Sequence, residues 1–131
     1  MNTALRVLRY LAPIYAGIVY LQLLSGGALL VNRQFLDHVI LGHMFVPVIP
    51  IPLLVVALRA RPYTQALRNF RVGAVIVLAV SWAQNILGTS GPQENFTVLI
   101  AHGANAGILF GGAVALAVLA VKLPPSGRLP L

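Results

Sequence analysis

Four long apolar runs constrain the fold of this chain more than any other feature of its sequence. They cover residues 11–31, 36–58, 70–88 and 97–121. A helix of about 20 apolar residues is long enough to cross the hydrocarbon core of a bilayer. Short connections make consecutive spans antiparallel neighbours. The sequence therefore predicts an all-α, integral membrane, up-down-up-down four-helix bundle, with residues 1–131 forming a single membrane domain.

The composition agrees with a membrane environment and excludes several functional classes. Hydrophobic residues make up 59% of the chain and charged residues 8%, against roughly 45–50% and 25% in soluble domains. Cysteine is absent, which excludes disulfide frameworks, thiolate metal sites and a cysteine nucleophile. The only carboxylates, Asp37 and Glu94, lie at the boundaries of spans, so a buried carboxylate relay for ion transport lacks its parts. We expect no catalytic residues and no nucleic-acid partner.

The basic residues are distributed unevenly between the two ends of the spans. Only Arg33 belongs to the end opposite the termini. The other eight belong to the end that carries the termini: Arg6, Arg9, Arg59, Arg61, Arg68, Arg71, Lys122 and Arg128. Short connections rich in Lys and Arg stay in the cytoplasm, so we expect both termini to be cytoplasmic. The tail at 123–131, which holds three prolines, is predicted to be extended.

The two halves of the chain contain a weak parallel repeat. An aromatic residue precedes both Gln22 and Gln84 by two positions, and a histidine follows each glutamine at a similar distance. His38 lies 16 residues after Gln22, and His102 lies 18 residues after Gln84. The repeat predicts a pseudo-twofold axis along the membrane normal. That axis places His38 and His102 at similar depth on opposite sides of the bundle.

The histidines are the strongest candidates for cofactor chemistry. Neutral imidazole binds haem iron well, and two such rings on facing helices suffice for it. His38 and His102 both lie near the start of their spans and differ in depth by about 4.5 Å. His43 lies about 7.5 Å deeper than His38 and about 140° around the helix, so those two cannot share one axial position. By depth His43 also matches His102, and it stays an alternative ligand.

Glycine and one arginine complete the predicted cofactor-binding set. Gly42, one turn after His38, and Gly103, next to His102, leave helix surfaces without side chains that suit a flat cofactor. Glycine at such spacing also permits close packing of membrane helices. Arg33 could neutralise carboxylates at a porphyrin edge, or pair with Asp37 or with lipid phosphate.

Three prolines interrupt the second span. Pro47, Pro50 and Pro52 follow the histidines of that helix. Proline lacks the N–H of a helical hydrogen bond and its ring clashes with the preceding turn. We expect the second span to be kinked or broken there.

Two short segments resemble a known family. They are Phe35-Leu36-Asp37-His38-Val39-Ile40-Leu41-Gly42 and Ala101-His102-Gly103-Ala104-Asn105-Ala106. Both resemble motifs of small four-helix prokaryotic membrane proteins of uncharacterised function, which are similar to one half of haem A synthase and, more loosely, to b-type cytochromes. The resemblance covers about residues 10–121. Val39 departs from it, because the pattern has arginine there, and the chain has one four-helix half where the synthase joins two.

The resemblance implies haem b held by His38 and His102 in the cytoplasmic (plasma) membrane of a prokaryote. The function that we expect is electron transfer, as a small accessory subunit of a larger membrane redox complex or as a homodimer. Two alternatives stay open. The same histidines could ligate the magnesium of a chlorophyll-type pigment, or they could form hydrogen bonds between helices in a structural subunit without a cofactor.

Overall fold

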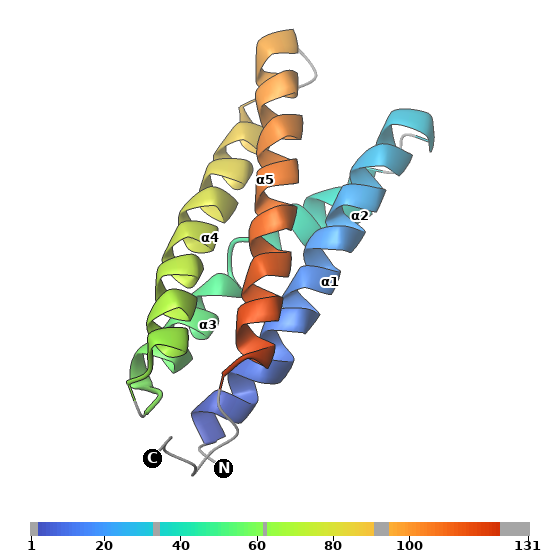
Figure 1. The fold of residues 1–131 in the computed structure, drawn as a ribbon. Helices are drawn as coiled ribbons and strands as arrows, with labels where there is room; N and C mark the ends of the chain where they lie inside the picture. The colour runs from blue at the N-terminus through green and yellow to red at the C-terminus, as the bar shows by residue number, and fades with distance from the viewer. Residues whose placement is uncertain (1–2, 33–34, 62, 91–94, 124–131) are drawn as a thin grey trace.

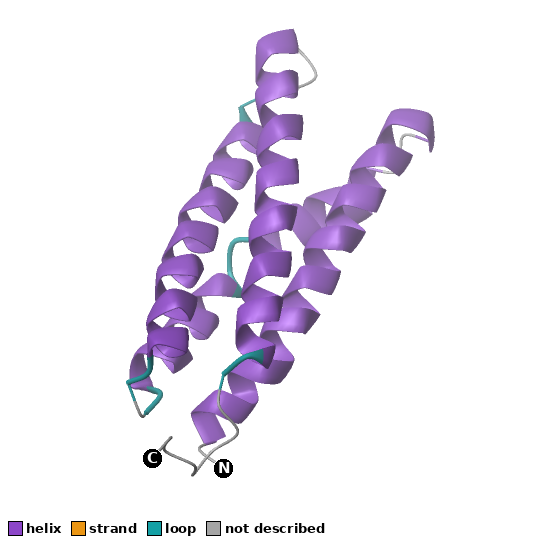
Figure 2. Ribbon diagram, in the orientation of Figure 1, coloured by secondary structure: helices purple, strands orange, loops and turns teal. Residues whose placement is uncertain are grey.

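A computed structural model describes residues 3–32, 35–61, 63–90 and 95–123, without the side chains of 27–32 and 35–37. All regular elements among these residues are helical (Figure 2). They are α1 (Thr3–Asn32), α2 (Phe35–Ile40), the π-helical turn η1 (Leu41–Phe45), α3 (Pro50–Arg59), α4 (Gln65–Thr89) and α5 (Phe96–Val121). Four segments are long and apolar enough to cross a membrane: Thr3–Gly26, His38–Arg59, Gln65–Thr89 and Phe96–Val121. The prediction of an all-α protein with four candidate membrane spans is confirmed.

The four spans pack as an antiparallel bundle (Figure 1). The outer contacts run from α1 to α5, from α5 to α4, from α4 to α3 and from α3 back to α1. The second and fourth spans are therefore diagonal neighbours across the bundle. The start of α1 and the end of α5 lie at the same end, where the Arg9 guanidinium donates a hydrogen bond to the Leu123 carbonyl.

Two helices begin earlier than the apolar runs predict. Helix α1 begins at Thr3 instead of residue 11, and α4 begins at Gln65 instead of residue 70. Arginine is a good helix former, so a basic residue can end an apolar run without ending a helix. The start of α4 is set by Thr64, whose hydroxyl accepts a hydrogen bond from the Leu67 N–H at 3.2 Å. Of the predicted extended tail, residues 124–131 lie outside the described residues.

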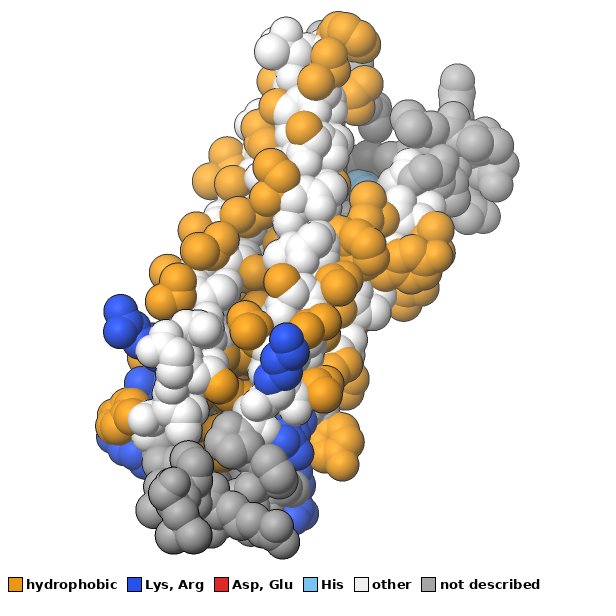
Figure 3. Space-filling view, in the orientation of Figure 1, with side chains coloured by type: hydrophobic (Ala, Val, Ile, Leu, Met, Phe, Trp, Pro, Cys, Tyr) orange, Lys and Arg blue, Asp and Glu red, His pale blue; other side chains and the backbone are white. Residues whose placement is uncertain are grey.

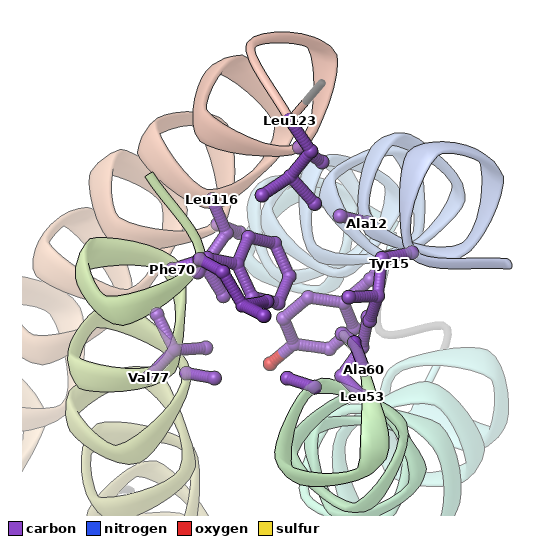
Figure 4. Packing of buried hydrophobic residues seen from close by; sticks show 14 of the residues in the cluster. Ala12, Tyr15, Leu53, Ala60, Phe70, Val77, Leu116 and Leu123 are labelled. Carbon is purple, nitrogen blue, oxygen red and sulfur yellow. The ribbon is translucent and has the colours of Figure 1, made fainter. Parts of the chain in front are cut away.

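The apolar core occupies the half of the bundle that holds the start of α1 and the end of α5. Tyr15, Leu53, Phe70 and Leu116 meet there from different helices (Figure 4). On α5, every buried residue lies at Leu109 or later. The buried polar side chains of the described part are Gln22, Ser81 and Gln84. The interior therefore changes from apolar to polar along the bundle, toward the end that holds His38 and His102.

The prolines break the second span, as predicted. Pro47 has no N–H to donate, and the Val46 N–H reaches back five residues to the Leu41 carbonyl at 3.0 Å. This wider spacing produces the π-helical turn η1. Helix α3 then begins at Pro50.

Tyr15 compensates for a hydrogen bond that Pro50 cannot make. In a regular helix the Val46 carbonyl would accept from the N–H of residue 50, and proline has none. The buried Tyr15 hydroxyl of α1 donates to that carbonyl at 3.1 Å. This hydrogen bond therefore links α1 to the second span at the point where that span is broken.

We expect Tyr15→Phe to destabilise the bundle by about 1–3 kcal/mol, because it leaves the buried Val46 carbonyl without a donor. Unfolding by sodium dodecyl sulfate, followed by circular dichroism, measures this change. The control is Tyr10→Phe, which removes the same hydroxyl from a residue that is 67% exposed. Equal stability of the two variants would show that the Tyr15 hydrogen bond contributes nothing.

Candidate functional site

His38 of α2 and His102 of α5 face each other across the diagonal of the bundle. Their ring centroids are 6.2 Å apart, and the ring planes are inclined by 73°. Part of a histidine side chain is visible in the recess between α5 and the upper part of α1 (Figure 3). The similar depth of the two rings agrees with the spacing of the two half-repeats.

A buried glutamine contacts each histidine from the preceding span. Gln22 Nε2 lies 3.1 Å from His38 Nδ1, and Gln84 Nε2 lies 3.1 Å from His102 Nε2. The glutamines are 7% and 5% exposed. Each pair joins the two spans of one half of the chain. The repeat in sequence is thus a repeat in structure.

A glycine lies beneath each histidine ring. A Cβ added at Gly26 would lie 3.1 Å from His38 Cε1, and one added at Gly88 would lie 3.2 Å from His102 Cε1. Each imidazole therefore packs against helix backbone where a side chain would displace it. Gly88 was not among the predicted site residues. The sequence does contain a pattern that points to Gly88, because a glycine follows both Gln22 and Gln84 by four positions.

Asn105 orients the pair in the second half of the chain. Its Nδ2 donates to the Val80 carbonyl at 3.1 Å and to Gln84 Oε1 at 2.8 Å. Because the oxygen of Gln84 faces Asn105, its nitrogen faces His102 and donates to Nε2. We assign the proton of neutral His102 to Nδ1 from this network. That Nδ1 is buried and has no hydrogen-bond partner in the described part of the chain.

The pair in the first half lacks this constraint. Ser25 Oγ donates to the Gln22 backbone carbonyl at 2.9 Å and lies 3.2 Å from His38 Nδ1. Gln22 Oε1 is buried and has no partner among the described residues. Rotation of the Gln22 amide, which would turn its oxygen toward the imidazole, therefore costs no hydrogen bond of that oxygen.

The other predicted residues are placed differently. His43 Nδ1 donates to the Val39 carbonyl of its own helix at 3.1 Å, and no hydrogen bond or ring contact between described residues joins His43 to the other two histidines. A Cβ on Gly42 would lie 2.6 Å from Gln22 Nε2, so Gly42 makes room for that glutamine. Gly103 has no atom within 4 Å of an added Cβ and leaves open surface. Arg33 lies outside the described residues.

The distance between the rings suits two ligands of one metal ion. With a metal–nitrogen bond of about 2.0 Å and about 1.2 Å from nitrogen to ring centre, imidazoles on opposite sides of a metal have centroids about 6.4 Å apart. The observed distance is 6.2 Å. Ligation would also require one nitrogen of each ring to face the metal. In the structure both nitrogens of His38 face Gln22 Nε2, and His102 Nε2 faces Gln84 Nε2.

The number of ligands favours haem over zinc. Zinc sites use three or four protein ligands, and no group of three or more His, Asp or Glu side chains gathers within the described ranges. Haem iron takes its other ligands from the porphyrin and needs only the two axial ones from protein. Two histidines on diagonal helices therefore fit the donor set of haem.

Comparison with protein-family models, with curated proteins and with solved structures gives no match to this chain. The similarity to half of a haem A synthase therefore stays a prediction, and the functional argument rests on the geometry of the site. What is shown is a four-helix protein with four candidate membrane spans.

Proposed function

We propose that this multi-pass membrane protein binds haem b between His38 and His102 and transfers electrons, as a small accessory subunit of a larger membrane redox complex. The observation that carries the proposal is the 6.2 Å separation of two imidazoles that come from diagonal helices. The glutamine and the glycine behind each ring support it, because each imidazole lies between a buried glutamine and helix backbone, although the glutamines contact different ring nitrogens. Bound haem would supply a one-electron oxidation and reduction at its iron.

Different residues of the chain would have different roles in holding haem. His38 and His102 would hold the haem iron, and Gly26 and Gly88 let both rings lie against helix backbone. Gln22, whose Oε1 has no partner in the described part, can accept the N–H of His38 and so orient the ring. Gln84 must release His102 Nε2 before that atom can bind a metal, because its amide donates to it.

The Gln84 contact favours a second function. The hydrogen bonds from Gln22 to His38 and from Gln84 to His102 join neighbouring spans without any cofactor. Hydrogen bonds between membrane helices contribute about 0.6 kcal/mol on average. The alternative is thus a structural subunit in which these pairs stabilise the bundle.

The absorption spectrum separates the proposals. Protein purified from haem-replete membranes is expected to give a pyridine haemochrome spectrum of haem b, with about one haem per chain. A colourless, metal-free preparation would favour the structural subunit and contradict haem binding. A magnesium-containing pigment would instead identify the histidines as ligands of a chlorophyll-type molecule.

We further propose that both termini are cytoplasmic. The Lys and Arg side chains that the structure describes gather toward the end that carries the termini (Figure 3), and positive charge is retained on the cytoplasmic side. Single cysteines at Asn32→Cys and Ser126→Cys can be labelled without interference, because the chain has no native thiol. In intact cells we expect an impermeant reagent to label Asn32→Cys alone. Labelling of Ser126→Cys alone would reverse the orientation.

A further inference from the structure

A small hollow lies at the basic end of the bundle, beside the connection between α3 and α4. Its volume is about 250 Å³, and its lining residues are Tyr63, Thr64, Gln65, Arg68 and Arg71. Pockets for drug-sized ligands measure about 300–1,000 Å³. This hollow therefore suits a small group.

One wall of the hollow is positively charged and fixed in place. Arg71 donates through Nε to the Ala57 carbonyl at 2.9 Å. One of its terminal nitrogens donates to the Leu58 carbonyl at 3.3 Å and to the Ala60 carbonyl at 3.2 Å. Its guanidinium carbon lies 4.5 Å from the centre of the Tyr63 ring, and that of Arg61 lies 3.9 Å from it. Two guanidinium groups, that of Arg61 after the end of α3 and that of Arg71 in α4, thus lie against the Tyr63 ring.

Arg68 carries a positive charge that no described residue neutralises. It is exposed and makes no hydrogen bond or ion pair with any described residue. No Asp or Glu occurs between residues 38 and 93, so no carboxylate of this region neutralises the cluster. The positive charge around the hollow therefore lacks a counter-charge from its own part of the chain.

We propose that this hollow binds a phosphate group, with Arg68 and Arg71 as its ligands. Guanidinium groups match phosphate oxygens in geometry and charge. The hollow lies at an end of the membrane spans, where lipid headgroups lie, and Tyr63 is 63% exposed there, as aromatic residues of the membrane interface are. The phosphate can come from the headgroup of an anionic phospholipid or from free inorganic phosphate.

Isothermal titration calorimetry of delipidated protein in detergent tests this proposal. The probes are dihexanoyl phosphatidylglycerol, dihexanoyl phosphatidylcholine and inorganic phosphate. The variant is Arg68→Gln, and the matched control is Arg59→Gln, which removes the same charge from an exposed residue of the same end outside the lining. For the anionic lipid we expect about a tenfold weaker Kd in Arg68→Gln, corresponding to about 1.4 kcal/mol, and less than about a twofold change in Arg59→Gln.

The three probes identify the source of the phosphate. Dependence on Arg68 for phosphatidylglycerol alone supports a lipid headgroup site, and dependence for inorganic phosphate as well supports a site for the free ion. Equal weakening by Arg59→Gln and Arg68→Gln would overturn the proposal, because it indicates diffuse attraction only. Equal binding of phosphatidylcholine and phosphatidylglycerol, with no effect of Arg68→Gln, would overturn it too.

Discussion

His38→Ala and His102→Ala are each expected to abolish haem binding, with haem content falling to less than about a tenth of that of the unaltered protein. Each substitution removes one of two rings that face each other at 6.2 Å. His43→Ala is expected to retain the cofactor, because His43 donates to the Val39 carbonyl of its own helix. The measurement is the haem-to-protein ratio after purification.

Chemical rescue distinguishes a lost ligand from a lost fold. Free imidazole added to His102→Gly is expected to restore the absorption spectrum, because the small ligand can enter the space that the ring leaves. A variant that fails to fold would not recover. Loss of colour in His43→Ala, beside full colour in His38→Ala, would transfer the ligand role to His43.

Gly88→Leu is expected to weaken haem binding by about tenfold or more, while the four-helix fold is kept. Even a Cβ at this position lies 3.2 Å from His102 Cε1, so a larger side chain must displace the ring. Gly17→Leu is the control, because nothing lies within 4 Å of an added Cβ there. Titration of the apoprotein with haemin measures the affinity of both variants.

Gly88→Ala tests the same contact with a smaller side chain. Its single Cβ requires a shift of the ring by a few tenths of an ångström, and we expect a smaller loss of affinity than in Gly88→Leu. Unchanged binding in Gly88→Leu would show that the His102 ring is not held in its observed position when haem binds.

Local chemistry explains why much of the fold could be predicted. The length of an apolar run sets whether it spans a bilayer, and proline removes a helical hydrogen bond wherever it occurs. Both rules act within one helix, so the spans and the break at Pro47 and Pro50 follow from the sequence. The helix starts were less accurate, because hydropathy does not register a cap such as Thr64.

Only the part of the site that repeats between the two halves of the chain could be predicted from the sequence. The spacing from Gln22 to His38 and from Gln84 to His102 paired the histidines. The orientation of Gln84 depends on Asn105, a contact between α4 and α5 that no spacing within one helix reveals. Gly103 has open space beside it, and its place in the cofactor site stays a prediction.

Low-temperature electron paramagnetic resonance of the oxidised protein tests most directly whether His38 and His102 ligate one iron from opposite sides. We expect a low-spin ferric signal typical of two imidazole ligands, converted to a high-spin signal in any haem that His102→Ala retains. A high-spin signal in the unaltered protein, or a low-spin signal that persists in His102→Ala, would contradict ligation by this pair.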